Sequence, residues 1–340
     1  VHFTPWENGE MRTEEEKSNL IGIALILFAV VLLSVMDGAM KHLIESGLSV
    51  VQILAVRSWI VVPLLLLWLP WAGGLSALKT SRIGLHLVRV VVGFGAPFFF
   101  FNSLKYLPLA DATVIFFGSS FIMTALSVPI LKEKVGAHRW TAIGIGFIGI
   151  AIAANPAGEV FNVGAFYSLG ASLSYSLMML ITRLMGRGEG TFKMVFFFHV
   201  WIGLASTALV ASGLGGVTFH PIDMAVSMDA LGGILVVTVL VIGGHVCLMR
   251  AFTMAPVGLL APFEYSAILW SALIGYLVWA DVPEMNFWGG ALLVVTSGVY
   301  LVHRENKLRK RDGAGAGDDV SAGVGPLPAP VPSSVRSEAD

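Results

Sequence analysis

The chain repeats part of its own sequence, and this repeat constrains the fold more than any other feature. Residues 97–151 align without a gap with residues 245–299, at an offset of 148 positions. The matched pairs include Pro108 with Pro256, Glu133 with Asp281, and Trp140 with Trp288. A long internal period of this kind indicates that two halves of the chain share one structural plan.

The repeat continues upstream at a slightly different offset. Residues 20–61 align with the residues 142 positions further on. The matched pairs include Ser34 with Ser176, Met36 with Met178, Lys41 with Arg183, Arg57 with His199, and Trp59 with Trp201. We therefore expect four parts, joined in the middle near Asn155-Pro156: an amino-terminal segment 1–19, a first repeat 20–155, a second repeat 156–305 and a tail 306–340.

The composition places these repeats in a bilayer. Hydrophobic residues make up 56% of the chain, charged residues 13%, and the mean hydropathy is +0.81. A soluble domain is about half apolar, so this chain exceeds that class. The net charge of −1 gives no basic surface for nucleic acid. The single cysteine, Cys247, excludes an internal disulfide and a cysteine-based metal site.

Ten apolar stretches have the length of a transmembrane helix, which needs about 20 residues. They predict an all-α integral membrane protein of ten helices, five in each repeat. The expected spans are about 20–43, 50–70, 83–104, 108–131, 138–155, 162–185, 191–212, 230–254, 257–280 and 286–303.

The two ends of the chain are polar. Met11 lies within the first 17 residues, so we interpret the first ten residues as an extension ahead of the natural start. The run from Leu20 is too long for a signal-peptide core and lacks a small-residue cleavage site, so it predicts a retained helix. From Asp312 the tail is rich in Gly, Ala, Pro, Ser and Asp, a composition typical of disorder.

Lysine and arginine predict the orientation. With the amino terminus in the cytoplasm, sixteen of these residues fall in inside segments and two, Lys41 and Lys105, in outside segments. The positive-inside rule then places both termini in the cytoplasm. Because each repeat has an odd number of spans, the second repeat enters from the opposite side. Inverted repeats of this kind are typical of carriers that work by alternating access.

Several segments match one known family. They are MDGAMKHL at 36–43, VRSW at 56–59, LKYLPLADATVIFF at 104–117, LKEKVGAHRW at 131–140 and LLAPFEYSAILW at 259–270. With the repeat spacing, these segments resemble the drug/metabolite transporter superfamily, in its ten-helix branch with two EamA-type repeats. The resemblance covers about residues 20–305 and implies a multi-pass transporter of the bacterial inner (plasma) membrane.

The resemblance implies a small-molecule cargo and no cofactor. Similar proteins carry S-adenosylmethionine, riboflavin, aromatic amino acids or drugs, so we expect a metabolite such as S-adenosylmethionine or riboflavin. An exporter of amino acids or drugs is the alternative within the superfamily. The family commonly has Glu where this chain has Asp281, and Glu-Arg or Glu-Lys at Glu133-Lys134; Asp281 is therefore a departure that leaves the assignment unchanged.

Two ionisable residues lie at a similar depth near the outer ends of the first two spans. Asp37 and Arg57 each lie about 10 Å inside the helix end, at ~1.5 Å per residue. An unpaired charge at this depth is costly, so the sequence predicts an ion pair at the outer mouth of the pathway. Lys41, one turn beyond Asp37, competes for the same carboxylate. A purely structural clamp between neighbouring helices explains the pair equally well.

Four more ionisable residues lie on the cytoplasmic half. We expect Arg89, His245 and Glu264 to form the polar wall of a cargo cavity, with Glu264 or a histidine exchanging a proton during transport. Pro262 removes a backbone donor just before Glu264 and weakens the ninth span there. The structural alternatives are a permanent Arg89–Glu264 salt bridge and a satisfied core histidine at His245. His199 stands where the first repeat has Arg57 and is left out of the site.

Aromatic and amide side chains complete the expected cavity. Asn102, which follows the run Phe98 to Phe101, is a candidate for cargo contact, as are Tyr175, Tyr265 and Trp270. Phenylalanines in a span more often pack or face lipid. Small residues in the fifth and tenth spans, including Gly144, Gly149 and Gly290, permit close helix approach, and a homodimer contact there is the further option.

Motifs for catalysis are missing from the sequence. It has no phosphate-binding loop, no paired metal-binding histidines at helical spacing and no nucleophile elbow. We therefore expect a carrier and not an enzyme, with no metal site. A membrane-embedded lipid enzyme would need clustered carboxylates or histidines near the headgroups, whereas here they are scattered singly. A simple membrane anchor would not need charges within inverted repeats.

Overall fold

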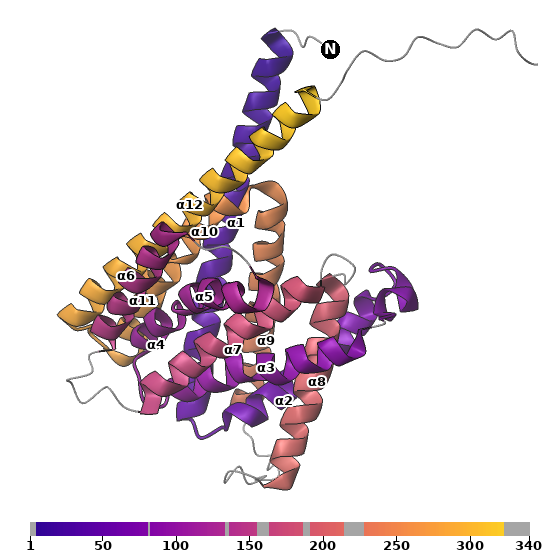
Figure 1. The fold of residues 1–340 in the computed structure, drawn as a ribbon. Coiled ribbons are helices and arrows are strands. Elements are labelled where there is room, and N and C mark those ends of the chain that lie inside the picture. Colours follow the sequence, from indigo (N-terminus) through magenta and orange to yellow (C-terminus); the bar gives the residue numbers. More distant parts are fainter. Residues whose placement is uncertain are drawn as a thin grey trace, which may run out of the picture.

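Figure 1 shows the computed structural model of the chain, which describes residues 5–80, 82–132, 136–154, 163–185, 191–213 and 228–322. In this part of the chain the secondary structure is helical. The elements are α1 Pro5–Glu45, α2 Val50–Trp68, η1 Gly74–Leu78, α3 Ile83–Ser103, α4 Leu109–Phe116, α5 Ser119–Leu131, α6 Ala137–Ala153, α7 Val163–Met185, α8 Thr191–Ser212, α9 Met228–Met254, α10 Val257–Glu264, α11 Ser266–Trp279 and α12 Met285–Ala322.

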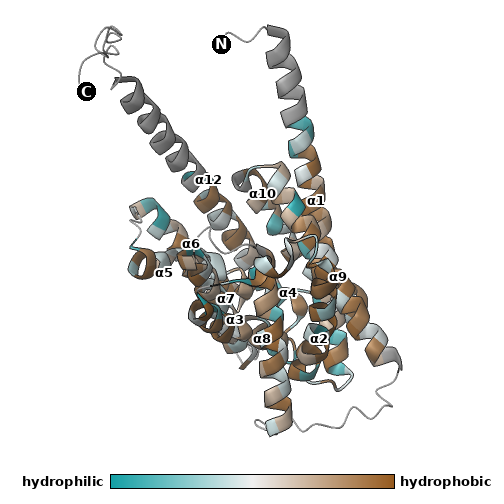
Figure 2. Ribbon diagram, turned by 90° about the vertical axis from the view of Figure 1, so that its right-hand side faces the viewer, coloured by the Kyte–Doolittle hydropathy of each residue, from teal (hydrophilic) through white to brown (hydrophobic). Residues whose placement is uncertain are grey.

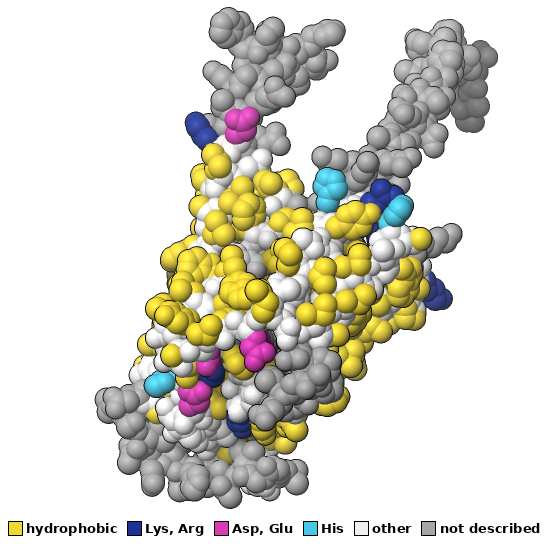
Figure 3. Space-filling view, turned by 90° about the vertical axis from the view of Figure 1, so that its left-hand side faces the viewer, with side chains coloured by type: hydrophobic (Ala, Val, Ile, Leu, Met, Phe, Trp, Pro, Cys, Tyr) yellow, Lys and Arg dark blue, Asp and Glu magenta, His cyan; other side chains and the backbone are white. Residues whose placement is uncertain are grey.

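The described helices form ten membrane-sized units. Nine stretches are long and apolar enough to cross a membrane, with α4 joined to α5 and α10 joined to α11. The tenth unit, α6, has 17 residues, which matches the lower limit of about 17 for a spanning helix. Hydrophobic residues cover the helices (Figure 2) and form a broad band around the bundle, with charged side chains gathered toward its ends (Figure 3). The predicted all-α, ten-helix membrane protein is confirmed.

Helix ends follow local sequence signals, and some of them recur in both halves. Ser49 begins α2 with a capping box, in which its hydroxyl accepts from the Gln52 backbone and the Gln52 side chain accepts from the Ser49 backbone. Prolines precede both α4 and α10. Lys132 and Ala280, which the 148-residue offset aligns, end α5 and α11 in the left-handed conformation, at φ 56° and 55°.

The helices of the two halves pair across the molecule. The most extensive contacts join α1 with α9, α3 with α7, α6 with α12, and α2 with α8. The sequence offsets align α1 with α7 and α3 with α9, so the α1–α9 pair is equivalent to the α7–α3 pair. They also align α2 with α8 and α6 with α12, so each of the last two pairs joins two equivalent helices. Neither half therefore forms a bundle by itself, since each helix in these pairs packs mainly on a helix from the other half.

Two of the membrane-sized units are interrupted, and the interruptions meet. The helix breaks between Phe116 and Ser119 in one unit and at Tyr265 in the other. Phe117 and Tyr265, which the 148-residue offset aligns, lie with ring centroids 4.9 Å apart. The weakened turn expected near Pro262 is thus present a few residues later, at Tyr265. The interruption after α4 was not expected, because no proline marks it.

Three serines of α7 bind the backbone around the first interruption. Ser168, Ser172 and Ser176 follow one another at helical spacing, and each is fully buried. We call them the serine ladder. The Ser168 hydroxyl lies 3.1 Å from the Ala112 carbonyl, Ser172 lies 3.1 and 3.2 Å from the carbonyls of Ile115 and Phe116, and Ser176 lies 2.8 Å from that of Ser119. Ser172 and Ser176 also lie 2.9 and 2.7 Å from the carbonyls one turn back in α7, so the ladder places buried hydroxyl donors between the backbone carbonyls of α7 and those around the interruption.

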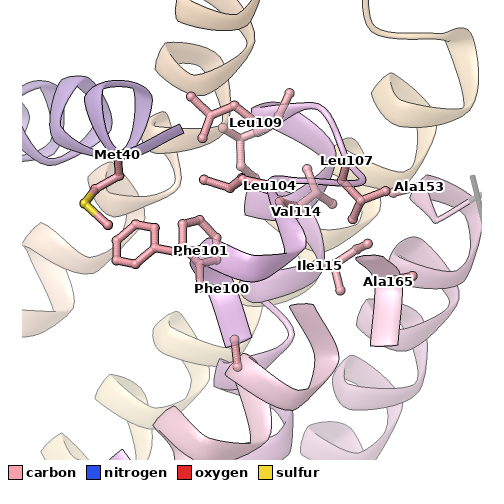
Figure 4. Packing of buried hydrophobic residues seen from close by; sticks show 14 of the residues in the cluster. Met40, Phe100, Phe101, Leu104, Leu107, Leu109, Val114, Ile115, Ala153 and Ala165 are labelled. Atoms are coloured by element: carbon pink, nitrogen blue, oxygen red, sulfur yellow. The ribbon is translucent and has the colours of Figure 1, made fainter. Parts of the chain in front are cut away.

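The main core lies where these broken helices meet α1, α3 and α7. Figure 4 shows Met40, Phe100, Phe101, Leu109 and Ile115 packed together from three different helices. The phenylalanines at 100 and 101 are therefore core residues, 8% and 4% exposed. This packing holds the first interruption against the centre of the bundle.

Close helix approach by glycine occurs within the chain. A Cβ at Gly149 of α6 would lie 2.9 Å from the Gly290 carbonyl oxygen of α12, so both glycines are required by this contact. Gly144, on the same helix as Gly149, has open space around it. The homodimer stays a prediction, and Gly149 and Gly290 are used by contacts inside one chain.

The ends of the chain differ from expectation. Helix α1 begins at Pro5, well before the apolar run from Leu20, and α12 continues to Ala322. Residues 306–322 of the expected disordered tail are thus helical here, because Lys, Arg and Glu after the span are good helix formers. Residues 323–340, the join near Asn155-Pro156 and the pair Glu133-Lys134 lie outside the described residues. The start of α1 and the end of α12 project from the same end of the bundle (Figure 1).

The serine ladder yields a stability prediction. Replacing Ser172 by alanine removes a buried hydroxyl that lies within hydrogen-bond distance of the Ile115, Phe116 and Ser168 carbonyls and can donate its one proton there, so we expect S172A to lower the free energy of unfolding by about 1 kcal/mol. Thermal unfolding of the detergent-purified protein measures the change. Ser174→Ala on the same helix is the control, because the Ser174 hydroxyl forms no hydrogen bond to a described residue. Equal melting temperatures for both variants would contradict this role.

Candidate functional site

Arg57 is unusual among the described side chains, because its Nε atom is buried and has no hydrogen-bond partner there. It lies on α2 and is 6% exposed. Among the residues that the structure describes, none forms a hydrogen bond with its guanidinium or an ion pair within 4.0 Å, and its Nε atom is fully buried. Charged residues inside membrane bundles are costly and mark functional positions. Arg57 is therefore the starting point of the site.

Asp37 of α1 lies close enough to Arg57 for the two charges to interact. Their charged groups are nevertheless more than 4.0 Å apart, so the direct ion pair expected from the sequence stays a prediction. Lys41 does not compete for Asp37. Its ammonium lies 3.3 Å from Asp281 and 4.0 Å from Glu45, over the Trp279 ring at 4.4 Å. Asp37 and Arg57 are therefore a separated pair of opposite charges.

Two histidines face the same charge. His199 of α8 and His245 of α9 both interact electrostatically with Arg57, and with each other. Their Nδ1 atoms lie 3.2 and 2.7 Å from the carbonyls of Val195 and Val241. A carbonyl oxygen only accepts, so Nδ1 carries the proton in both rings and Nε2 is left as an acceptor. His199, which the sequence alone leaves out of the site, is therefore a further candidate beside Arg57.

Glu264 forms a second centre at the end of α10. It interacts electrostatically with Tyr175 of α7 and with Tyr265, whose hydroxyl bonds the Ser120 side chain. Tyr265 is 7% exposed and packs against Phe117, so it links the two interrupted helices. Glu264 therefore sits where both helix interruptions meet, which agrees with the expected weak turn in this region.

Arg89 bonds residues of two neighbouring helices. Its guanidinium Nε lies 2.7 Å from the Thr182 hydroxyl and an Nη lies 3.2 Å from the Met194 carbonyl, while the centroid of the Phe198 ring lies 5.6 Å from its Cζ atom. Arg89 thus ties α3 to α7 and α8. The expected grouping of Arg89 with Glu264 and His245 around a cargo cavity stays a prediction.

Of the remaining candidate residues, some make contacts within a helix or the core and one lies beside Glu264. The Asn102 amide donates to the Phe98 carbonyl, 2.7 Å away within α3, and the side chain is 9% exposed. The Tyr175 ring meets the Phe116 ring at 5.4 Å, beside Glu264. Trp270 packs on the small core cluster around Ile26. Of the aromatic candidates, Tyr175 has the clearest place in the site.

An acidic pocket lies at the end of the bundle opposite the start of α1, and sequence reasoning did not find it. It has a volume of about 160 Å³ and is lined by Asp111, Asp281 and Glu284, among others. The Lys41 ammonium pairs with Asp281 at its edge. Among the described residues, no group of three or more His, Cys, Asp or Glu side chains is arranged to hold a metal ion. The aligned pair Glu133 and Asp281 was the signal that pointed to this region.

Comparisons with known proteins find similarity to transporters. Residues 20–155 match the EamA-like transporter family. The chain is 24% identical to an S-adenosylmethionine uptake transporter of Rickettsia bellii, over 87% of this chain and 98% of that protein. It is 25% identical to a riboflavin transporter of Vibrio cholerae, over 79% and 88% of the two chains. It is 26% identical to the pseudopaline exporter CntI of Pseudomonas aeruginosa, over 81% and 93%.

A solved structure supports the same fold. A crystal structure of a protein with 17% sequence identity superposes with a TM-score of 0.54, over 84% of this chain and 97% of that one. The ten membrane-sized helices, the buried ionisable groups and the similarity to three kinds of metabolite carrier are all consistent with this fold. Residues 20–155 of the chain thus match the EamA-like transporter family, and the chain as a whole is similar to transporters of small metabolites.

Proposed function

We propose that the protein is a secondary transporter that moves a small metabolite across the bacterial inner membrane by alternating access. The observation that carries the proposal is the meeting of the two interrupted helices at Phe117 and Tyr265, beside Glu264. Broken helices at the centre of a bundle are typical of transporter binding sites. The pairing of each half with the other supports it, because rocking of one half against the other opens the centre to alternate sides.

The proposed inverted repeats run from residue 20 to 155 and from 156 to 305. Two observations support this proposal. The α1–α9 contact has an equivalent in the α7–α3 contact, and α5 and α11 both end at a residue in the left-handed conformation. Both termini are cytoplasmic in this proposal. The excess of Lys and Arg on that side and the common direction of the α1 start and the α12 end support it.

The proposed cargo is a polar or amphipathic metabolite of the size of S-adenosylmethionine or riboflavin, the cargoes named for two of the relatives. Export is the second candidate, because one relative is named as an exporter. The proposed contacts are Glu264 and Tyr175 at the interruptions, and Asp37, Arg57 and His245 on the first, second and ninth helices. No cofactor is part of this proposal.

Cargo flux tests the function directly. Proteoliposomes containing the purified protein should accumulate radiolabelled S-adenosylmethionine, or fluorescent riboflavin, with saturable kinetics and competition by unlabelled cargo. Protein-free liposomes are the control for leak. Extraction of the lipids from the same vesicles tests for a modified product. Conversion of lipid without any saturable flux would favour a membrane enzyme and contradict the proposal.

Labelling of single cysteines tests the orientation. In a Cys247→Ala background we expect Ser46→Cys, between α1 and α2, to react with a membrane-impermeant maleimide from the periplasm. Ser76→Cys in η1 should react only after the cells are permeabilised. Both serines are exposed, so accessibility of the side chains does not separate them. The reverse pattern would place the termini in the periplasm. Labelling of Ser46→Cys and Ser76→Cys from the same side would show that α2, between them, does not cross the membrane.

Glu264 is the proposed proton-carrying group. A carboxyl group inside a bundle can bind a proton in one conformation and release it in the other. We expect that transport by the Glu264→Gln variant no longer accelerates when a proton gradient is imposed across the vesicle membrane. Glu16→Gln, at an exposed position before the first span, is the matched control. A gradient response equal to that of the unchanged protein would refute the role of Glu264.

A further inference from the structure

Buried polar atoms without partners gather where α2 packs on α8. Among the described residues, four such atoms belong to these two helices: Arg57 Nε, Ser58 Oγ, Trp201 Nε1 and Ser206 Oγ. The neighbouring contact is fully made, because the Trp59 indole donates to the Thr207 hydroxyl at 2.9 Å. Unmet hydrogen-bonding capacity in a membrane bundle indicates that a polar molecule completes it.

Two opposite charges near the contact between α2 and α8, on Arg57 and Asp37, do not form a direct ion pair with each other. Among the described residues, the Arg57 guanidinium has no ion-pair partner within 4.0 Å, and Asp37, which would neutralise it, lies on α1 at a longer distance. Lys41, which lies one turn beyond Asp37 on α1, pairs with Asp281 and Glu45 and not with Asp37. Asp37 and Arg57 together therefore offer one anionic and one cationic group to a ligand.

We propose that Arg57 and Asp37 bind the α-amino acid group of the cargo, with the carboxylate on Arg57 and the ammonium on Asp37. The inference rests on the proposed transport function and names the chemical class of the cargo. A zwitterionic head matches the separated pair, because each of its charges meets the opposite charge and the net charge of the site is unchanged.

The chemistry of the neighbouring side chains fits this head. A guanidinium presents two parallel N–H groups to a carboxylate and binds it more strongly than a neutral donor does. His199 and His245 expose Nε2 as an acceptor, because Nδ1 of each ring donates to a backbone carbonyl. The imidazoles therefore add acceptors for an ammonium or amino group and do not compete with Arg57 as donors to the carboxylate.

The inference separates two cargoes that the relatives suggest. S-adenosylmethionine carries an α-amino acid group, whereas riboflavin has neither a carboxylate nor an ammonium. If Arg57 and Asp37 recognise the head, the protein selects the first class. The aromatic contacts near Phe116 and Tyr175 are compatible with a ring system in either molecule, so they do not decide between the two.

Binding to the intact, detergent-purified protein tests the inference with four probes: S-adenosylmethionine, its decarboxylated analogue, the mixture of common amino acids, and riboflavin. We expect S-adenosylmethionine to bind at least about tenfold more tightly than the decarboxylated analogue, because a charge-assisted hydrogen bond is lost. Arg57→Gln should remove this difference by weakening only the carboxylate-bearing ligand. Asp37→Asn should weaken both, because both retain the ammonium.

Two controls keep the result interpretable. Arg250→Gln makes the same change of charge at an exposed position on α9 and should leave the tenfold preference intact. If Arg57→Gln does not fold, the comparison of the two S-adenosylmethionine compounds on the unchanged protein still decides the matter. Equal affinity for both compounds, or a preference that survives in a folded Arg57→Gln variant, overturns the inference.

The remaining outcomes distinguish this inference from the proposed function. Binding and flux of riboflavin without binding of any amino-acid-bearing probe overturn the role of Asp37 and Arg57 and leave the carrier function standing. Binding of none of the probes also overturns the inference, and the flux assay then decides the function independently. A tenfold preference without flux in vesicles would uphold the recognition site and refute transport.

Discussion

The structure depends on a constraint that the bilayer imposes: polar groups within the hydrocarbon must find partners in the protein. Most of them do. The broken helix after α4 receives hydroxyl donors from Ser168, Ser172 and Ser176, and the Lys41 ammonium receives Asp281. Arg57 is the charged exception, because no described residue bonds its guanidinium, and buried atoms of Ser58, Trp201 and Ser206 also lack partners among the described residues. The contrast between the satisfied groups and these unsatisfied ones locates the site more sharply than hydropathy does.

The halves of the chain depend on each other for packing. Helix α1 lies on α9 and α3 lies on α7, so the buried face of each half is covered by the other. The glycines that bring α6 and α12 together work in the same way, since Gly149 and Gly290 meet across the halves. A cargo held near Phe117 and Tyr265 would touch both halves at once, as alternating access requires.

Hydropathy and the internal repeat were enough to predict the class, the ten helices and most of their limits. They did not predict the interruption after Phe116, because no proline marks it and glycine and serine, present here as Gly118, Ser119 and Ser120, also occur within continuous membrane helices. Contacts between residues far apart in the chain also could not be predicted from the sequence. Lys41 bonds Asp281, and Arg89 bonds Thr182 because α3 packs on α7. The alignment of His199 with Arg57 is visible in the sequence. It favoured a structural role for His199, so the sequence did not place His199 in the site.

The serine ladder has no counterpart of equal strength in the other half. The 142-residue offset aligns Ser168 with Ile26 and Ser172 with Val30, and both of these pack by apolar contact beside Leu260 of α10. Isoleucine and valine slide over a neighbouring surface without breaking a hydrogen bond, whereas each serine would have to release a carbonyl. The α10–α11 unit can therefore bend at a lower energetic cost than the α4–α5 unit, which makes the two otherwise similar halves mechanically unequal.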